Sequence, residues 1–421
     1  MTARKITIVG AGQSGLQLGI GLLGHGYDVT IVSNRTPEEI RNGQVASSQC
    51  MFGQALAHER DLGLDLWPDA PTVDGISFTL PHPERAGETA FSWSHRLDAP
   101  AQSIDQRVKM PEFLRVFAER GGRIAYEDAG IEELERYAAA SDLVLVAAGK
   151  GEIARMFERD AQRSLYAAPQ RALALTYVNG LNAREEHSAV CFNLIPGVGE
   201  YFAFPALTTT GPCEIMVFEG VPGGPMDQWQ GLTPQEHLEH SKRILETFLP
   251  WEAERASAVE LTDERGILQG RFAPTVRKPV AQLPSGRTVL GLADVVVLND
   301  PITGQGSNNA SKCAASYLQS ILAHGDRAFD EAFMRQTFES YWDYARHVAQ
   351  WTNAMLAPPP EHAVQLLGAA AAHPEIAKRF VNGFDFPPDF QDWFLDPDKA
   401  QRYLAEVQGH AEVRATVHST P

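Results

Sequence analysis

The chain has 421 residues and a formal net charge of -17, from 53 acidic and 36 basic side chains. An acidic balance of this size argues against nucleic acid or an anionic membrane surface as a partner. Hydrophobic residues make up 44% of the chain and charged residues 21%, which is typical of a globular protein. No apolar run is long enough to cross a membrane. The four cysteines have no metal-ligand spacing, so we predict no metal site and expect a reduced, cytoplasmic protein.

The first predicted unit is a strand, a glycine turn, a helix and a second strand within residues 5–32. The apolar run at 6–9 is typical of a buried strand, and Gly10, Gly12 and Gly15 follow it in G-x-G-x-x-G spacing. Gly10 permits a tight turn, Gly12 lets the backbone approach a pyrophosphate, and Gly15 lets helix and strand pack closely. We therefore predict a dinucleotide site at the N-terminus of this helix.

The second strand ends in Ser33, Asn34 and Arg35. Dinucleotide folds usually place an acidic residue at this point to bind the ribose hydroxyls, and this chain has none there. Ser33 or Asn34 could bind the ribose instead, with Arg35 facing the adenosine end. The missing acid makes NAD a weaker candidate and leaves FAD open.

The remaining elements alternate between strands and helices up to about residue 325, and the rest of the chain looks mostly helical. Parallel strands typical of a doubly wound sheet are predicted by residue 150, and antiparallel strands between 171 and 220 indicate an inserted second domain. In chain order we predict strands at 76–80 and 91–93, a helix at 108–120, strands at 124–126, 143–146, 173–178, 190–194, 201–204 and 214–218, a helix at 234–248, a strand at 288–290 and a helix around 310–321.

A second glycine loop lies at Asp300-Pro301-Ile302-Thr303-Gly304-Gln305-Gly306, shortly after Asp294, and again opens a helix. Its backbone N–H groups and the positive end of the helix dipole suit an anionic atom. In a flavin site that atom belongs to the N1/O2 edge of the reduced ring, and Asp294 suits a ribityl hydroxyl.

This pattern resembles the second flavin motif of the flavin-dependent aromatic hydroxylases, with Ala293–Asp294 in place of their Gly-Asp pair. The chain further resembles styrene and indole monooxygenases over roughly residues 4–400. The similarity is carried by the run from Ser103 to Arg107, by Arg120-Gly121-Gly122, by the 300–306 loop and by Trp351-Thr352-Asn353.

The resemblance implies an α/β fold with a Rossmann-like FAD-binding domain of the aromatic hydroxylase type, an inserted substrate domain with a mostly antiparallel sheet, and a helical C-terminus. The expected boundaries are 1–45, 102–170 and 285–335 for the FAD-binding domain, 46–101 and 171–284 for the substrate domain, and 336–421 for the helical region.

The resemblance also implies which residues contact FAD, with Arg107 near the phosphates and Ala129 near the adenine. The expected contacts are Gly10, Gly12, Gln13, Ser14, Gly15, Ser33, Asn34, Arg35, Arg107, Ala129, Asp294, Pro301, Gly304, Gln305, Gly306, Ser307 and Asn308.

Single-component hydroxylases carry an Asp-Gly pair where this chain has Ala148–Gly149. The lost carboxylate argues against direct reduction by NADPH. By resemblance, FAD arrives reduced from a separate NADH-dependent flavin reductase, NADH is used by that partner only, and O2 forms a flavin C4a-hydroperoxide that oxygenates the substrate. The flavin carries this chemistry, so no acid–base pair is expected. A homodimer is left open.

Six positions separate the styrene type from the indole type in this family, and this chain has the indole-type residue at each: Ser47, Gln49, Met51, Val73, Ile76 and Ala101. With Pro301 they are the expected substrate contacts. We therefore expect epoxidation of the C2=C3 bond of indole, which leads to indoxyl and indigo. The alternatives are a styrene monooxygenase, a single-component NAD(P)H-dependent hydroxylase, and a non-catalytic binding protein on a flavin fold.

Overall fold

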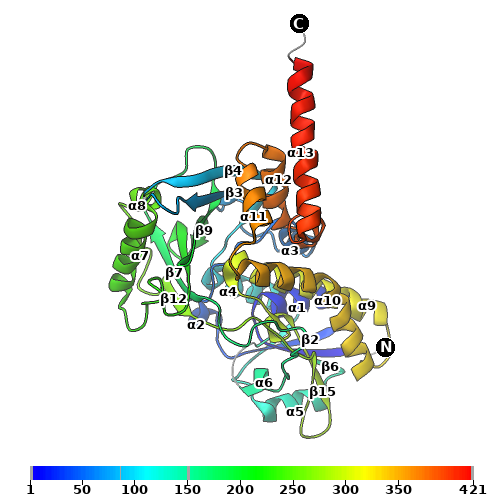
Figure 1. The fold of residues 1–421 in the computed structure, drawn as a ribbon. Helices are drawn as coiled ribbons and strands as arrows, with labels where there is room; N and C mark the ends of the chain where they lie inside the picture. The colour runs from blue at the N-terminus through cyan, green and yellow to red at the C-terminus, as the bar shows by residue number, and fades with distance from the viewer. Residues whose placement is uncertain (1–2, 86, 149–151, 419–421) are drawn as a thin grey trace.

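The structure is a computed structural model that describes residues 3–85, 87–148 and 152–418. Two large β-sheets organise these residues, and helices pack on both of them (Figure 1). The first sheet is the predicted nucleotide-binding sheet, and the second contains most of the strands predicted between 72 and 220.

The nucleotide-binding sheet has six strands in the order β14-β15-β6-β1-β2-β5, and every pair except β14–β15 is parallel. Four residues of β1 are buried, and β6 is buried throughout, as expected for parallel strands with helices on both faces. The strands are β1 (Lys5–Val9), β2 (Asp28–Ser33), β5 (Arg123–Tyr126), β6 (Leu143–Val146), β14 (Val280–Gln282) and β15 (Thr288–Gly291).

Helices α1 (Gln13–Gly24), α4 (Gln106–Glu119) and α9 (Gly306–His324) belong to the same layered unit. Helix α1 packs against both α4 and α9. Leu16, Ile20, Phe113 and Ile321 are buried in the cluster that the helices share with β1 and β2. The smaller helices of the N-terminal half are α2 (Pro37–Arg41), α3 (Gly53–Asp61), α5 (Ile131–Ala140) and α6 (Glu152–Arg155).

The second sheet, called here the large sheet, follows the order β11-β7-β10-β9-β8-β3-β4, with β12 also paired to β7. Its pairs are antiparallel except β3–β8, which is parallel. Its strands are β3 (Thr72–Pro81), β4 (Thr89–Gln102), β7 (Ala172–Asn179), β8 (Ala189–Ile195), β9 (Gly199–Thr208), β10 (Gly211–Gly220), β11 (Glu260–Leu261) and β12 (Ile267–Gly270).

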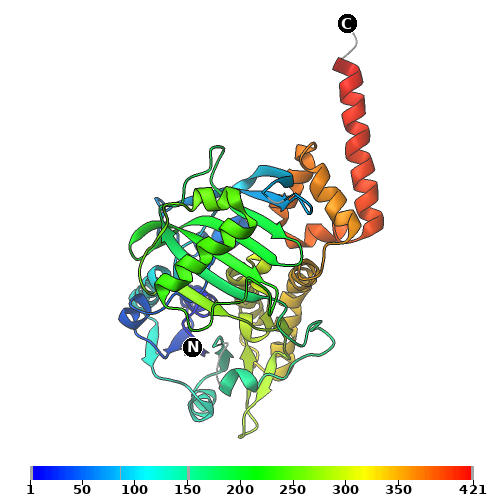
Figure 2. The ribbon, with the colours of Figure 1, turned by 60° about the vertical axis from the view of Figure 1, so that its left-hand side comes forward.

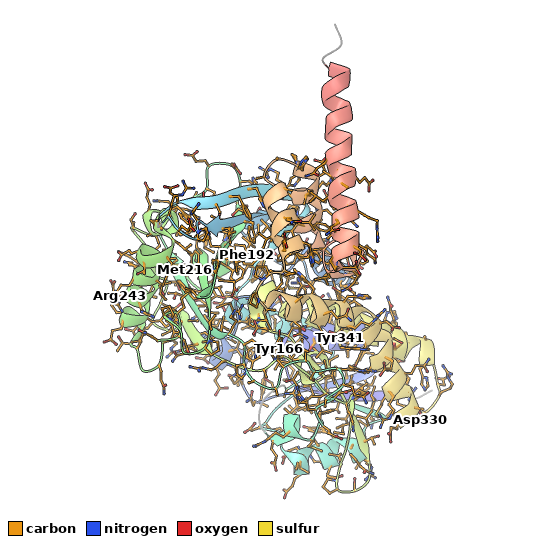
Figure 3. All side chains as sticks on the ribbon, viewed as in Figure 1. Tyr166, Phe192, Met216, Arg243, Asp330 and Tyr341 are labelled. Atoms are coloured by element: carbon orange, nitrogen blue, oxygen red, sulfur yellow. The ribbon has the colours of Figure 1, made fainter. Side chains whose placement is uncertain are left out.

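Alternate residues of the large sheet face two different cores. Ile215 and Val217 of β10 belong to the same core as Ile302 of the second glycine loop, whereas Met216 and Phe218 face the opposite side. That opposite side is covered by α7 (Pro234–Phe248) and α8 (Pro250–Arg255), and α7 runs across the sheet in the turned view (Figure 2). Met216 lies in the sheet and Arg243 on the outer helix (Figure 3).

The C-terminal part is helical; its first helix packs against α9, and the helices after it rest on the core side of the large sheet (Figure 1). It consists of α10 (Glu331–Met355), α11 (Glu361–Ala369), α12 (Pro374–Gly383), the 3-10 helix η3 (Pro387–Asp392) and α13 (Pro397–His418). Helix α13 extends away from the rest of the molecule toward the C-terminus in both ribbon views. The short pieces η1 (Ala293–Val295), η2 (Pro301–Thr303), β13 (Thr275–Val276) and β16 (Val297–Leu298) complete the chain.

The predicted fold class is confirmed, and β6 and α7 have the predicted bounds. One predicted boundary is wrong. Strand β14 falls in 171–284, which we expected to belong to the substrate domain, but it pairs with β15 in the nucleotide-binding sheet. The hairpin forms because Pro284, Ser285 and Gly286 provide a turn between two short apolar strands. These turn residues are the local signal that places the preceding strand in this sheet.

Candidate functional site

The first glycine loop has the geometry that its three glycines predict. Gly10 has a φ of 124°, and a Cβ there would lie 2.8 Å from the carbonyl carbon of Ala147. A Cβ on Gly15 would lie 2.1 Å from the carbonyl oxygen of Gly10, so helix and strand could not approach as they do. A Cβ on Gly12 would meet no described atom within 4 Å. The loop therefore combines a tight turn, close packing and an open backbone face.

The N-terminus of α1 is open to an anion because no side chain of the described residues caps it. Gln13 and Ser14 are both buried in its first turn. The amide of Gln13 donates to Gln17 (3.0 Å) and to Glu59 (2.7 Å), so its side chain is engaged inside the protein. At Gln13 and Ser14, the donors available to an anion are therefore the backbone N–H groups of the uncapped first turn.

The end of β2 lies beside this loop and carries the predicted adenosine-side residues. Ser33 is buried, and its hydroxyl donates to the carbonyl of Arg35 (2.7 Å), which closes a turn. Asn34 and Arg35 are exposed, and Ala129, beyond the neighbouring strand β5, is half-buried. These positions leave two polar side chains accessible beside the glycine loop.

The second glycine loop, called here the flavin loop (Asp300–Gly306), also ends at an open helix. Asp300 caps the 3-10 turn of Pro301, and its Oδ1 accepts from the N–H of Ile302 (3.1 Å). Gly304 has a φ of 63°, which favours glycine. No described side chain caps α9. A Cβ on Gly304 or Gly306 would meet no described atom within 4 Å.

Two polar atoms at this loop have no hydrogen-bond partner among the described residues, namely the hydroxyl of Ser307 and Oε1 of Gln305. Such buried groups are normally paired, so they suit a ligand that brings polar atoms. The amide nitrogen of Gln305 donates to the carbonyl of Phe384 (2.9 Å). Asn308 is used differently, because its side chain accepts from Phe52 N (2.8 Å) and donates to Cys50 O (2.8 Å). It ties the flavin loop to the 47–52 segment.

Asp294 belongs to the short 3-10 helix η1 that follows β15. Its side chain is exposed, yet the surrounding protein raises the pKa of the carboxyl to about 6 by desolvation. The preceding Ala293 has a φ of 53°, where glycine is favoured. This explains why the related motif has glycine at this position, and it means that the backbone of Ala293 is strained.

Arg107 is buried, and its guanidinium group is paired with two acidic side chains. Its Nε donates to Asp105 (2.9 Å), and Nη1 and Nη2 donate to Asp263 (3.0 Å each). Nη2 also donates to Thr208 (3.0 Å). The expected contact of Arg107 with the FAD phosphates stays a prediction, and the structure assigns most of its donors to protein groups.

The residues expected to line the substrate pocket are brought together around the 101–107 segment. Val73 pairs with Ala101 in the β3–β4 ladder, and Met51 forms an isolated bridge with Gln102. Val73, Ile76 and Ala101 are fully buried in the same core cluster as Ile302 of the flavin loop. Pro301 is half-buried beside it. The sulfur of Met51 accepts from the ammonium of Lys109 (3.0 Å), which itself pairs with Glu59.

Ser47 and Gln49 form a short hydrogen-bonded chain. The Ser47 hydroxyl donates to Oε1 of Gln49 (2.5 Å) and accepts from the amide of Gln106 (3.0 Å). The Gln49 amide donates to the carbonyl of Ile104. A hydroxyl oxygen accepts twice, so Ser47 retains one acceptor position.

A buried acid cluster at the flavin loop, made up of Arg171, Glu200, Glu219 and Asp300, was not predicted from the sequence. All but Arg171 are almost fully buried. The residues come from four segments, so no short motif joins them. The available signal was a glutamate in the apolar run of β10, at a position that faces the core.

Ala148 follows β6 and lies against the first glycine loop, since a Cβ on Gly10 would come within 2.9 Å of its nitrogen. Gly149, the second residue of this pair, lies outside the described residues. No helix of the described chain is long and apolar enough to cross a membrane. Within the same ranges, no group of three His, Cys, Asp or Glu could hold a metal ion.

The two open helix N-termini, the glycine backbones and the unpartnered polar atoms fit FAD. Among solved structures, the flavin-dependent brominase Bmp2 matches with a TM-score of 0.59 at 13% identity, over 97% of this chain and 94% of that chain. The tetrameric form of 2-methyl-3-hydroxypyridine-5-carboxylic acid oxygenase matches with a TM-score of 0.55 at 13% identity, over 90% of this chain and 93% of that chain. These likenesses show the fold alone, which is the α/β fold of the aromatic hydroxylase type.

Sequence comparisons narrow the class. The family described as "Styrene monooxygenase A putative substrate binding domain" matches residues 149–255. A styrene monooxygenase, StyA, of Pseudomonas fluorescens is 29% identical over 407 residues, covering 94% of this chain and 96% of the relative. A StyA from Pseudomonas sp is 28% identical over 419 residues, covering 96% and 98%. The chain is thus similar to styrene monooxygenases along nearly its whole length.

Proposed function

We propose that the protein is the oxygenase component of a two-component system that inserts one oxygen of O2 into the C2=C3 bond of indole. It would receive reduced FAD from a separate NADH-dependent reductase. The observation that carries the proposal is the similarity to styrene monooxygenases along nearly the whole chain. The preference for indole depends on the six residues around the 101–107 segment.

The protein's contribution is to bind, orient and exclude water. FAD, when bound, supplies the activation of O2. The backbones of the two glycine loops would hold its pyrophosphate and its ring edge, and Asp294 would hold the ribityl chain. Val73, Ile76 and Ala101 are buried in the same apolar core as Ile302 of the flavin loop, and an apolar lining would disfavour the wasteful release of hydrogen peroxide.

The free acceptor position of Ser47 suits the N–H of an indole ring. The hydrogen bonds to Gln106 and Gln49 fix the orientation of the Ser47 hydroxyl, so its remaining lone pair points in one direction. Styrene has no N–H group and gains nothing from this acceptor. The proposed selectivity for indole over styrene therefore comes from one hydrogen bond. Its contribution of about 1 kcal/mol corresponds to a factor of about five in relative rate.

Ala148 favours delivery of reduced FAD by a partner. A carboxylate at this position would lie against Gly10, whereas a methyl group adds no charge there. The purified protein is expected to show no steady oxidation of NADH in the absence of a reductase. Steady oxidation by the protein alone would instead support a single-component hydroxylase.

The decisive experiment mixes the protein with FAD, NADH and any flavin reductase, and then offers indole and styrene in equal amounts. The expected result is blue pigment from indole with little styrene oxide. Styrene monooxygenase is the second candidate, favoured by the two Pseudomonas relatives, and an excess of styrene oxide would establish it. Failure to bind reduced FAD would indicate a non-catalytic binding protein.

Two variants test the substrate side, with a matched control. Ser47→Ala and Gln49→Leu are expected to lower the ratio of indole to styrene turnover by about fivefold, since each disturbs the same acceptor. Ser48→Ala changes the neighbouring hydroxyl and should leave the ratio unchanged. If both substitutions kept the full preference for indole, the role of Ser47 and Gln49 would be wrong.

A further inference from the structure

The acid cluster lies where one end of the large sheet meets the flavin loop. Glu219 of β10 stands directly opposite Glu200 of β9 in the antiparallel ladder, so their side chains share one face of the sheet. This is the face of Val217, which lies in the same core cluster as Ile302 of the flavin loop. Asp300 is the first residue of that loop.

The four side chains differ in how their charges are balanced. Arg171 donates to both oxygens of Glu200, at 2.7 and 2.9 Å, so these two form an ion pair. Glu219 is fully buried, and neither of its oxygens has a hydrogen-bond partner in the described chain. Burial, reinforced by the charges of Asp300 and Glu200, raises the pKa of Glu219 well above its usual range. A buried carboxylate without a partner is costly, so this environment favours the protonated form of Glu219.

Asp300 is the member of the cluster that can change its charge near neutral pH. Burial and the charge of Glu200 raise the pKa of Asp300, and the N–H of Ile302 and Arg171 lower it, with a result of about 6. Arg171 and Glu200 balance each other, whereas Asp300 has no ion-pair partner among the described residues.

This charge lies next to the place where a reduced flavin would carry its own. Asp300 caps the turn of Pro301–Thr303, and α9 begins three residues beyond that turn with an open N-terminus. The flavin loop is the expected partner of the N1/O2 edge, which is anionic in the reduced ring. Two negative charges in a partly buried site repel one another strongly.

We propose that Asp300 is a positioning residue of the flavin site that takes up a proton when an anionic reduced flavin binds and releases it when the flavin is oxidised. The inference rests on the proposed function, since it places FAD at the flavin loop. The proton would remove the repulsion without changing the cap, because a protonated carboxyl still accepts from Ile302 N–H.

The consequence is a preference for reduced FAD that depends on pH. Below pH 6 Asp300 is neutral in both states, so it does not oppose the reduced flavin. Above pH 6 the free protein is ionised at Asp300 and must take up a proton or bear the repulsion. The preference for reduced over oxidised FAD should therefore fall as pH rises, by roughly tenfold for each unit of pKa shift in the complex.

The test measures the dissociation constants of oxidised and anaerobically reduced FAD between pH 5.5 and 8, at roughly half-unit steps, fine enough to resolve a tenfold change per pH unit. Asp300→Asn keeps an oxygen that accepts from Ile302 N–H but cannot titrate. Its preference for reduced FAD should equal that of the wild type at the acidic end and exceed it by roughly tenfold at the alkaline end. Comparison at each pH cancels the titration of the flavin itself.

Glu214→Gln is the control, because Glu214 lies on the same strand with its side chain on the opposite face of the sheet, and it should behave as the wild type. Asp300→Ser, which can also cap the turn, replaces the asparagine variant if that one does not fold. Identical preferences of the wild type and the Asp300 variants at every pH would overturn the inference. Failure of the wild type to bind reduced FAD at any pH would instead refute the proposed function.

Discussion

Both ends of the large sheet place ionisable side chains in the core. At one end these side chains are paired, and at the other end one of them is not. At one end, Arg107 is paired with Asp105, Asp263 and Thr208, so its donors are engaged. At the other end, Glu219 is buried without a hydrogen-bond partner among the described residues. A satisfied network holds a structure in one arrangement, whereas an unsatisfied acid responds to what binds beside it.

The difference separates two tasks of the site. The Arg107 end joins segments that lie far apart in the chain, since Arg107 and Asp263 are 156 residues apart. The Glu219 end lies at the flavin loop, where the charge of a cofactor would change during turnover. We expect substitutions at the first end to cost stability at every pH, and those at the second to have effects that depend on pH.

The largest expected effect is that of Arg107→Ala. It leaves Asp105 and Asp263 without their cation, and breaking a buried ion pair costs about 3–5 kcal/mol. The free energy of unfolding, measured by urea denaturation, should fall by this amount. Arg243→Ala removes an exposed arginine of α7 (Figure 3) and should change stability by less than about 0.5 kcal/mol. If Arg107→Ala lowered the free energy of unfolding by an equally small amount, the contrast between the two ends of the sheet would be wrong.

Glu219→Gln should change how stability depends on pH. The pKa of Glu219 is raised in the folded state above its ordinary value of 4.5, so the folded protein binds a proton that the unfolded chain releases. The wild type therefore loses stability as pH rises above 4.5. The variant lacks this loss, so its stability relative to the wild type should grow as pH rises above 4.5.

Urea denaturation at several pH values measures this growth. Glu260→Gln, at an exposed position of β11, serves as the control and should run parallel to the wild type. A difference in unfolding free energy between Glu219→Gln and the wild type that does not change with pH would mean that Glu219 is ionised in the folded protein. The raised pKa of Glu219 would then be wrong.

Tyr177→Phe tests the satisfied end with a smaller change. The hydroxyl of Tyr177 donates to the carbonyl of Ser47 (2.9 Å), and its removal leaves a buried oxygen unpaired at a cost of about 1–2 kcal/mol. The melting temperature should drop, and the ratio of indole to styrene turnover should move with it, because Ser47 loses its support. Tyr126→Phe, at a residue that is 49% exposed, should change neither.

The smallest expected effect is a gain from Ala293→Gly. Ala293 has a φ of 53°, and glycine relieves about 1 kcal/mol of backbone strain, partly offset by the greater entropy of the unfolded chain. Calorimetry should show an unchanged or slightly raised melting temperature. A clear drop would mean that the methyl group contributes more through packing than the turn costs.

The parts of the site that could be predicted from sequence are those encoded by neighbouring residues. Gly10, Gly12 and Gly15 lie in one turn and their roles follow from spacing, and α7 is likewise encoded locally, because its Thr233 cap adjoins the helix in the chain. The acid cluster depends on strand register, since Glu219 meets Glu200 through the β9–β10 ladder. The pairing of Arg107 with Asp263 was also out of reach, because either residue alone looks like a solvated charge.

Helix α13 has a practical consequence for engineering. From Pro397 to His418 it spans 22 residues, about 33 Å at about 1.5 Å per residue, and it carries the chain end away from both sheets (Figures 1 and 2). A genetic fusion at the C-terminus would therefore start clear of the glycine loops. Tethering a flavin reductase there would raise its local concentration to about the millimolar range, so one polypeptide could both make and use the reduced cofactor.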